Sequence, residues 1–457
     1  MKKFIQRYIV LLGIVFIGAL AGLGFVACTS DDDVLNRLDE KVATDSNPRL
    51  RTEAEAIEIA IGNLGMIDRA VPRSRAASDI VADVSVIGSK VKSRNGATND
   101  TLLYAVNFKN NEGFALVPAS RKADPLLAIC EKGNYSPGCE KLNPGFGIYM
   151  GLAEKKLTDL EIVSDEPTLN TGDNDSEFVP EFKPYDGDNT RPLETKETSD
   201  TIWHFLVQPR VKVQWGQKGI YGALAPNKTA GCAPVAMAQA MSYFNHPRYM
   251  KFTFNEREIE ELHIDWEQIK RHQKRTSFSY QCQCDAKNHT HISHILRQIG
   301  KDAKSEYKDG GRTPTNNNDT KSLLKKHGFS ISGFHKYNAG DGIKIGDGII
   351  LIYGDDTNAQ GKYSAHIWVL DGIKNFTTRH TVYCKQTNSI QWTVMSQNTS
   401  TFHFNHFNWG WDGDYDGWFN DMVFNREVPV DMSYWDQNIG TPGYDFKHHV
   451  QYLLVNH

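Results

Sequence analysis

All nine tryptophans and all sixteen histidines of this chain lie after residue 200, and residues 1–200 contain neither type. A single uniform domain would not separate two residue types in this way, so the sequence predicts two folded units. Between them, residues 165–200 are rich in acidic residues and proline, which is typical of an exposed linker. Its basic residues Lys183, Arg191 and Lys196 are predicted to be open to proteolytic nicking.

Charge and cysteine content exclude several classes of protein. The 457 residues carry 51 basic and 55 acidic side chains, a net charge of -4, so no overall attraction draws the chain to nucleic acid. Seven cysteines are too few for a disulfide scaffold. With 40% hydrophobic and 23% charged residues, the chain is expected to fold into several domains behind a targeting segment.

The first 27 residues form a positively charged start followed by an apolar run, which is typical of a secretory signal peptide. Small Ala27 before Cys28, with acidic residues after it, resembles a bacterial lipobox, which implies cleavage and lipid attachment at Cys28. The alternative is an uncleaved membrane anchor, since the apolar run is just long enough to span a bilayer. In the lipoprotein, residues 28–50 would be a tether. In either case the remainder is expected outside the cytoplasm. The resemblance implies an anchor in a bacterial membrane, the outer one, from which the mature domain could be released.

Residues 51–164 predict a small α+β domain. Thr52 and Glu55 have the spacing of a capping box that opens a helix. Cys130 and Cys139 could form a disulfide outside the cytoplasm or remain two half-buried thiols. Alternating apolar residues then predict strands over residues 81–91, 102–108 and 114–118.

The segment after Cys232 is rich in Ala, Met and Gln, which predicts a helix that ends by Asn245, ahead of Pro247. Pro234 fits only in the first turn of such a helix. Cys232 would therefore lie at the helix N-terminus, where the helix dipole favours the nucleophilic thiolate. The alternative is a buried structural cysteine, the commoner fate of a lone cysteine.

Two further residues could act with this thiol. Gln217, in a Gln-Trp-rich loop before the helix, could donate a hydrogen bond to an oxyanion. His366 lies in a predicted strand that is expected to end at a turn over Asp371 and Gly372, and its imidazole could activate a thiol. For each residue taken alone, a packing role is the alternative.

A Trp-Gly-rich segment near residue 410 supplies candidate supports for the imidazole. Asn408 could orient the ring, and Trp409 or Trp411 could shield that hydrogen bond from water. The alternative is a turn with packing aromatic side chains. The other histidines of this region, including His406, are expected to be surface or packing residues.

Neither of two possible metal-binding patterns fits a standard site. Asp412, Asp414 and Asp416 alternate as in a calcium loop, but no bidentate Glu follows, so a turn is predicted. Cys282 and Cys284, with the histidines after them, have no standard zinc spacing and predict an insertion loop. The sequence therefore predicts no metal and no cofactor.

Together these segments resemble the streptopain family of papain-like bacterial cysteine peptidases, roughly over residues 200–457. The order of Gln217, Cys232, His366 and Asn408–Trp409 is that of the papain-like superfamily, and Tyr444–Phe446 is similar to the final strand region. Residues 104–108, 113–120 and 125–128 resemble the inhibitory propeptide of the family more weakly. The resemblance implies a zymogen of α+β class, with a propeptide domain over 51–164 and a papain-like catalytic domain over 201–457. It also implies that activation cleavage falls in the linker over 165–200.

The resemblance also implies roles. Cys232 would be the nucleophile, His366 its proton partner, and Gln217 with the backbone N–H of Cys232 the oxyanion hole. Asn408 and Trp409 would support the histidine. The implied substrate-binding residues are Gly231, Ala365, Ile367 and Trp411. Ala365 stands where the family usually has Gly and Ile367 where a small residue is usual, so both are expected to narrow the substrate cleft.

The predicted function is that of a surface-anchored cysteine endopeptidase acting on proteins or peptides, with its own propeptide as inhibitor. One alternative is a non-catalytic adhesin or haemagglutinin-like binding protein on the same fold, although a binding protein does not need all four polar residues. A second is another Cys-His acyl-transfer enzyme, an amidase or transpeptidase. The propeptide-like first half favours the peptidase, because a destructive activity needs restraint during export.

Overall fold

A computed structural model describes the chain over residues 50–67, 77–88, 101–139, 143–162, 193–254, 258–271, 292–357, 363–386, 390–424 and 449–457. Several predictions lie outside these residues. They concern the signal peptide with Cys28, the linker residues Lys183 and Arg191, the Cys282–Cys284 insertion, and Tyr444–Phe446.

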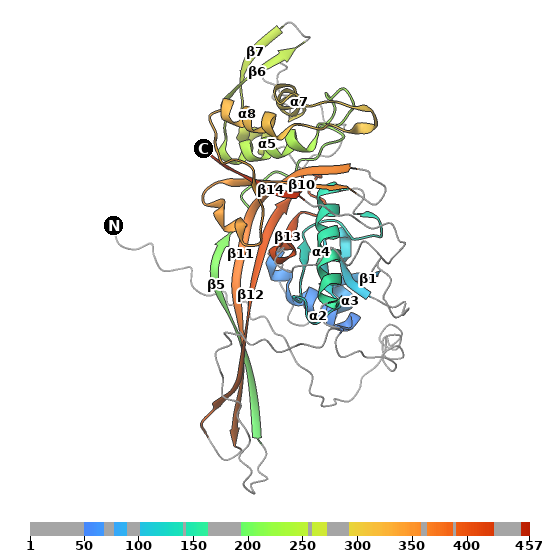
Figure 1. Ribbon diagram of the computed structural model, residues 1–457, viewed down its shortest axis with the longest axis vertical. Helices are drawn as coiled ribbons and strands as arrows, with labels where there is room; N and C mark the ends of the chain where they lie inside the picture. The colour runs from blue at the N-terminus through green and yellow to red at the C-terminus, as the bar shows by residue number, and fades with distance from the viewer. Residues whose placement is uncertain are drawn as a thin grey trace, which may run out of the picture.

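One twelve-stranded antiparallel sheet dominates the molecule (Figure 1). Its strands follow the order β1-β2-β3-β4-β13-β12-β11-β10-β14-β8, with β5 paired to β11 and β9 to β14, and β6 and β7 form a separate pair. The strand bounds are β1 Val81–Gly88, β2 Thr101–Phe108, β3 Phe114–Pro118, β4 Ala128–Cys130, β5 Leu193–Val207, β6 Tyr249–Phe254, β7 Glu258–His263, β8 Ser330–Ile331, β9 His335–Lys336, β10 Ile349–Thr357, β11 Tyr363–Gln386, β12 Thr393–Asn408, β13 Gly417–Asn420 and β14 His449–Asn456.

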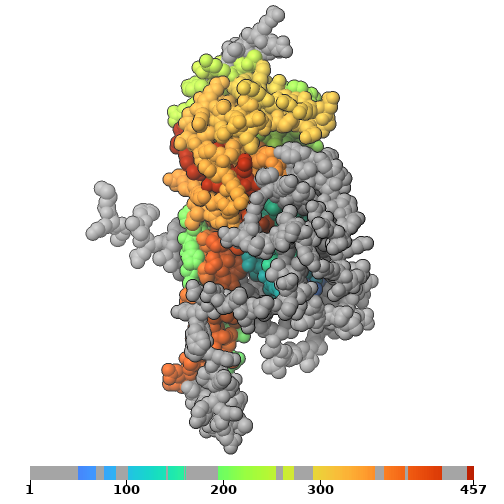
Figure 2. Space-filling view, viewed as in Figure 1, coloured from blue at the N-terminus to red at the C-terminus, as the bar shows by residue number. Residues whose placement is uncertain are grey.

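Helices pack against both faces of this sheet, so the expected α+β class is confirmed. The bounds are α2 Glu53–Gly62, α3 Ala77–Ile80, α4 Pro144–Ile162, α5 Cys232–Phe244, α6 Trp266–Arg271, α7 Ile292–Asp302 and α8 Asn317–Lys326. Short 3₁₀ helices cover Leu64–Ile67, Lys109–Asn111, Asp309–Gly311, Asp341–Ile345 and Asp421–Phe424. Helices α5, α7 and α8 gather with β6 and β7 at one end of the molecule, and β5, β11 and β12 extend as an arm at the other (Figures 1 and 2).

The central strand β11 is buried on both faces near its start. Ile367 and Val369 pack in the apolar cluster around α5, while Trp368 and Leu370 pack in the cluster that contains α4. Because successive side chains of a strand point to opposite faces, a strand covered on both sides reads as a continuous apolar run. By the same alternation His366 lies on the α4 face.

The sheet is continuous across the predicted domain boundary. Strand β4 of the first half pairs with β13 of the second, with Ile129 opposite Trp418. The predicted linker is wrong at its end, because its last eight residues form the start of β5, where Lys196 lies opposite Tyr383 of β11. A polar segment can form a strand when a distant strand offers a full ladder of backbone partners, and this pairing is not visible locally.

Other local predictions can be compared directly with the structure. The capping box of Thr52 and Glu55 is confirmed, and so is the helix from Cys232, which ends at Phe244 with Asn245 in a left-handed conformation. The predicted turn at Asp371–Gly372 is wrong, because β11 continues through both residues. A Cβ at Gly372 would lie 2.9 Å from the Cβ of His406, so this glycine permits close strand packing rather than a turn.

The remaining cysteine and membrane expectations bear on where chemistry could occur. Cys130 and Cys139 are both buried thiols and are not joined by a disulfide. Within the described ranges, no helix is both long and apolar enough to cross a membrane. Among the same residues, no group of three His, Cys, Asp or Glu side chains is placed to hold a metal ion.

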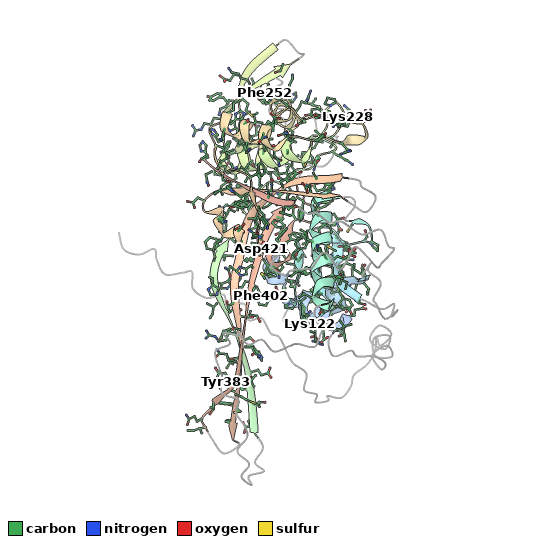
Figure 3. All side chains as sticks on the ribbon, viewed as in Figure 1. Lys122, Lys228, Phe252, Tyr383, Phe402 and Asp421 are labelled. Carbon is green, nitrogen blue, oxygen red and sulfur yellow. The ribbon has the colours of Figure 1, made fainter. Side chains whose placement is uncertain are left out.

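Side chains fill the body densely around Asp421 and become sparser along the arm near Tyr383 (Figure 3).

Candidate active site

Cys232 is the first residue of α5, and the geometry before it depends on glycine. Gly231 is the N-cap, with a φ of 98°, and a Cβ there would lie 2.8 Å from Cγ2 of Thr313. A side chain is therefore excluded both by conformation and by space. The backbone N–H groups of Ile367, Ala233 and Cys232 itself point to the sulfur. The thiol thus lies where α5 meets β11.

The protonation of this thiol departs from the simple helix-dipole expectation. Cys232 is half-buried, and burial raises the pKa of its thiol, although the three backbone N–H groups partly oppose this shift. A desolvated thiolate is costly even at a helix N-terminus. In the arrangement described here, burial therefore favours the neutral thiol of Cys232 over the thiolate.

His366 is held by a backbone carbonyl. Its Nε2 lies 2.9 Å from the carbonyl oxygen of Trp409. A carbonyl only accepts, so Nε2 carries the proton of the neutral ring and Nδ1 is left as the basic nitrogen. Burial lowers the pKa of His366 to about 4, and the Trp409 carbonyl only partly opposes this. Among the described contacts, no hydrogen bond joins His366 to Cys232.

The first turn of α4 covers the imidazole. A Cβ at Gly145 would lie 2.6 Å from Cδ2 of His366 and 2.5 Å from Cε3 of Trp409, so the helix backbone is in direct contact with both rings. Trp368 stacks on His366 with ring centroids 6.1 Å apart, and Trp411 meets it edge to face at 6.2 Å. His366 is therefore 2% exposed, and part of this cover comes from the first half of the chain.

Gln217 lies in the loop between β5 and α5 and is 8% exposed. Its backbone oxygen accepts a hydrogen bond from Ala230 at 2.8 Å, which ties the loop to the residues just before Cys232. Among the described residues, no acceptor lies within reach of the buried side-chain Nε2. A buried donor without an acceptor is costly, and it is available to a negatively charged oxygen.

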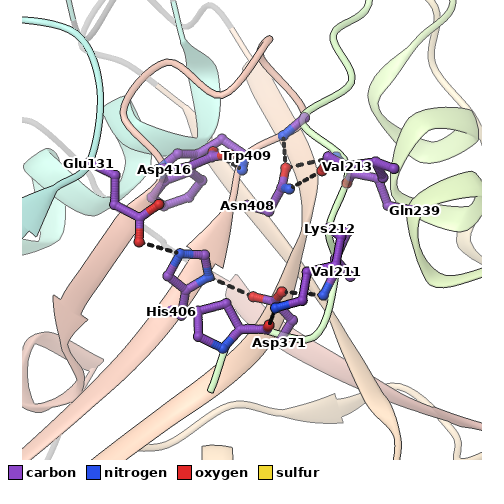
Figure 4. Close-up of polar contacts among 12 residues, drawn as sticks. Glu131, Val211, Lys212, Val213, Gln239, Asp371, His406, Asn408, Trp409 and Asp416 are labelled. Atoms are coloured by element: carbon purple, nitrogen blue, oxygen red, sulfur yellow. Dashed lines mark hydrogen bonds and ion pairs between the residues drawn. The ribbon is translucent and has the colours of Figure 1, made fainter. Parts of the chain in front are cut away.

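Asn408 does not touch the imidazole. Its Oδ1 accepts hydrogen bonds from Nε2 of Gln239 at 2.7 Å and from the backbone N–H of Gly410 at 3.1 Å, and its Nδ2 donates to the carbonyl of Val213 at 2.8 Å (Figure 4). The expected direct contact of Asn408 with the histidine is therefore replaced by the carbonyl of the next residue, Trp409.

The four expected substrate-binding residues are not alike. Gly231 is buried, whereas Ala365 and Trp411 are half-buried beside His366. Ile367 is 4% exposed and packs in the α5 cluster, so its expected role in narrowing a cleft is not supported. Strand alternation explains this, because the side chain after His366 must point to the opposite face of the sheet.

A buried ionic cluster, centred on His406, was not predicted. Its Nδ1 lies 2.6 Å from Oδ1 of Asp371, and its Nε2 lies 3.3 Å from Oε1 of Glu131 (Figure 4). Burial alone would lower the pKa of His406, but Asp371 and Glu131 together raise it to about 10. Nearby, burial raises the pKa of Asp416 to about 8, against the opposing N–H of Trp409. No local sequence pattern marks a contact between carboxylates and a histidine so distant along the chain.

The Peptidase C10 family model matches residues 215–419. A search of the curated proteins finds no match. Among solved structures, a fragment of Prevotella intermedia prointerpain A is similar with a TM-score of 0.43 and 16% identity, covering 79% of this chain and 96% of that one. Active interpain A cysteine protease from the same organism gives a TM-score of 0.34 and 15% identity, covering 56% and 95%.

Both TM-scores are low, so these structures support no conclusion by themselves. The family match contains Gln217, Cys232, His366 and Asn408, and it confirms the predicted resemblance to the streptopain family. Over residues 215–419 the chain is therefore similar to the Peptidase C10 family, and it is a cysteine-type peptidase.

Proposed function

We propose that the chain is a cysteine endopeptidase made as a zymogen, with Cys232 as nucleophile and His366 as its proton partner. The observation that carries the proposal is the position of His366. The carbonyl of Trp409 holds its Nε2, and the first turn of α4 covers its ring at Gly145. The first contact orients the imidazole for catalysis, and the second keeps substrate and solvent from reaching it.

The proposed reaction needs one basic nitrogen and one nucleophile. Because Nε2 of His366 donates to Trp409, the unprotonated Nδ1 is the nitrogen that takes the proton of Cys232. The sulfur attacks the peptide carbonyl carbon, and the carbonyl π electrons move to the oxygen. When the tetrahedral adduct collapses, the C–N bond breaks and the leaving amine takes the proton from the imidazolium. Water then attacks the thioester carbonyl carbon while His366 accepts its proton. The C–S bond breaks, and the leaving sulfur of Cys232 takes the proton back from the imidazolium.

The oxyanion of that reaction needs donors. Gln217 carries a buried Nε2 without an acceptor among the described residues, and Cys232 offers its backbone N–H at the start of α5. A buried donor without a hydrogen-bond acceptor destabilises the resting protein. The same donor can bind the negative charge that forms on the oxygen only in the transition state. We therefore assign these two groups to the oxyanion hole.

Latency would follow from the contacts between the first half and the sheet. Strand β4 extends the sheet at β13, and Tyr149 of α4 donates to the carbonyl of Asn420 at 3.3 Å. With α4 in place, His366 is buried and neutral, and the Cys232 thiol has a raised pKa, so a thiolate–imidazolium pair is disfavoured. Removing the first half would expose the imidazole and return its pKa toward the ordinary value.

The activation cut is expected within residues 163–192. Helix α4 ends at Ile162, and β5 starts at Leu193 and pairs with β11 along its length. A protease needs an extended, accessible segment, so Lys196 inside β5 is a poor site. Lys183 and Arg191 remain the proposed sites, and β5 would stay with the mature enzyme.

Lipid attachment at Cys28 and a position outside the cytoplasm remain part of the proposal, supported by the signal-like first 27 residues. Proteins or peptides are the proposed substrates, and residues 51–164 the proposed inhibitor. The separate alternatives are a binding protein of adhesin type and an amidase or transpeptidase.

An intact-mass time course of the chain from Thr29 under mild reductant tests the proposal, with wild type beside Cys232→Ala. Wild type should shorten within residues 163–192, and the product should react with a thiol-directed epoxide. Cys232→Ala should stay whole, and wild-type product should cleave an unrelated unfolded protein.

Two results would count against the proposal in different ways. If neither chain shortens by itself, and neither reacts with the epoxide even after trypsin cuts the linker, catalysis is rejected in favour of binding. If the processed chain reacts with the epoxide and cleaves small amides but no protein, the amidase alternative replaces the endopeptidase.

A further inference from the structure

A buried pair of side-chain amides joins α5 to the end of β12. Nε2 of Gln239 donates to Oδ1 of Asn408 at 2.7 Å, and the two residues are 0% and 2% exposed (Figure 4). Gln239 follows Cys232 by seven residues, which is two helical turns, so both lie on about the same face of α5. The pair therefore connects the helix that carries the nucleophile to the segment that carries Trp409.

Asn408 touches a third segment as well. Its Nδ2 donates to the carbonyl of Val213 at 2.8 Å, four residues before Gln217. One buried amide thus contacts the segments that hold the proposed nucleophile, oxyanion donor and imidazole support. A group with three partners on three segments fixes their relative positions better than any two of the contacts would.

Asn408 also shapes the turn that presents the Trp409 carbonyl. Its Oδ1 accepts from the N–H of Gly410, two residues on, which closes a side-chain turn around Trp409. Gly410 has a φ of 66°, and a Cβ there would lie 3.0 Å from Cγ1 of Val235 on α5. The N–H of Trp409 is held by Oδ1 of Asp416 at 2.8 Å. The carbonyl that meets His366 is therefore aimed by contacts on both sides.

Gln239 keeps this arrangement at a cost. Among the described residues, its buried Oε1 has no hydrogen-bond donor. An apolar side chain of similar length, such as Met, would fill the helix face without burying an unmet acceptor. Among the contacts that the structure describes, the side-chain hydrogen bond that Gln239 makes, and a Met would lose, is the one to Asn408.

We infer that Gln239 is a positioning residue that holds Asn408, and through it the Trp409 carbonyl, in register with the helix that bears Cys232. The inference rests on the proposed function, because it assigns Gln239 a part in the Cys232–His366 reaction. Gln239 touches no reacting atom. Its effect would be on the alignment of His366 and on the stability of its charged form, not on the binding of substrate.

The test compares Gln239→Met with Gln298→Met. Both variants are produced as the full chain and assayed after self-processing. Gln298 is a matched control, since it is a buried helical Gln whose Oε1 accepts from the N–H of Thr253 and whose Nε2 donates to Asp302, in α7. Active sites are titrated with the epoxide, and kcat is expressed per titrated site. Gln239→Met is expected to lower kcat by about 10- to 100-fold, as for a misaligned catalytic group, with KM unchanged. Gln298→Met is expected to leave both values unchanged.

The pH profile gives a readout that a merely structural residue would not move. The Trp409 carbonyl raises the pKa of His366, so a loosened contact lowers it. His366 acts as a base in its neutral form, so its pKa sets the acidic limb of the kcat/KM profile. That limb should therefore move to lower pH in Gln239→Met and stay in place in Gln298→Met. Gln239→Glu should rescue at low pH, because a buried protonated carboxyl can donate to Asn408, and the rescue should fade as the pH rises.

The outcomes separate the inference from the function beneath it. If wild type shows no titratable, Cys232-dependent turnover, the proposed function fails first. If wild type turns over and Gln239→Met matches it in kcat per site and pH profile, the inference is overturned. If Gln239→Met does not fold, Gln239→Glu decides alone, and a ratio to wild-type activity that is flat across pH overturns the inference.

Discussion

The two halves of β11 follow one backbone course in different surroundings. From His366 to Ile373 the strand pairs first with β10, up to Leu370, and then with β12, from Val369, and helices cover both faces, so its side chains are buried. From Phe376 to Gln386 it lies between β5 and β12 in the projecting arm, where most of the described side chains are half-exposed or exposed (Figures 1 and 3). Backbone pairing is satisfied in both halves, so the covering layers, not the strand itself, determine which side chains carry stability.

The largest difference is expected between ion pairs. Asp371 is 0% exposed and binds His406 at 2.6 Å, whereas Glu197 of the arm meets His380 at 3.3 Å near the surface. In the uncut Cys232→Ala chain, Asp371→Asn should destabilise by about 3–5 kcal/mol, because the buried charge of His406 loses the nearer of its two carboxylate partners. Glu197→Gln should cost at most about 1 kcal/mol. Urea unfolding measures both.

The same pair should give a pH signature. The pKa of His406 is raised to about 10, above the ordinary value of about 6.5. Its stabilisation is therefore complete below about pH 6.5 and is lost as the pH rises through about 10. The free energy of unfolding of Asp371→Asn should therefore fall less as the pH rises than that of the parent chain. An equal fall in the two chains would show that His406 does not cause this loss of stability.

Apolar truncation should give the next largest contrast. Leu370 is 0% exposed between Ile350 and Phe407, and Val382 of the arm lies half-buried opposite Ser396. Leu370→Ala should cost about 2–5 kcal/mol through lost contacts and a cavity. Val382→Ala should cost well under that, since solvent fills the space. Comparable losses would mean that the arm has a hydrophobic core of its own.

The smallest effect is expected at Lys385, near the tip of the arm. Its Nζ lies 2.7 Å from Oε2 of Glu194 and 5.0 Å from the ring centroid of Trp392. Lys385→Ala should change the free energy of unfolding by about 0–1 kcal/mol, because solvent screens a pair that is only partly buried and because its formation costs side-chain entropy. Thermal unfolding and self-processing should both remain near wild type. A clear slowing of self-processing would mean that the arm takes part in activation.

The features that the sequence predicted well depend on local chemistry. The start of α2 follows from Thr52 and Glu55, and the bounds of α5 follow from Pro234 in its first turn and Asn245 at its end. Cys232 at a helix N-terminus could be predicted for the same reason. Each of these signals lies within a few residues of the feature that it marks.

The features that it missed depend on contacts between distant segments. Strand β5 was read as linker because its polar residues show no pattern until β11 supplies their partners. His406 gave no sign of its buried charge, since Asp371 and Glu131 are brought to it only by the sheet. The contact of His366 with the carbonyl of Trp409, rather than with the side chain of Asn408, likewise depends on how β12 ends beside β11.

The pairing of β4 with β13 has a consequence for the timing of activation. A cut between residues 163 and 192 breaks a covalent bond but leaves this pairing, and the packing beneath it, in place. What changes is the effective concentration of the first half, which falls from that of a tethered neighbour to that of a free molecule. Cleavage would then permit activation without causing it, and the dilution of the released first half into the surroundings would decide when the enzyme begins to work.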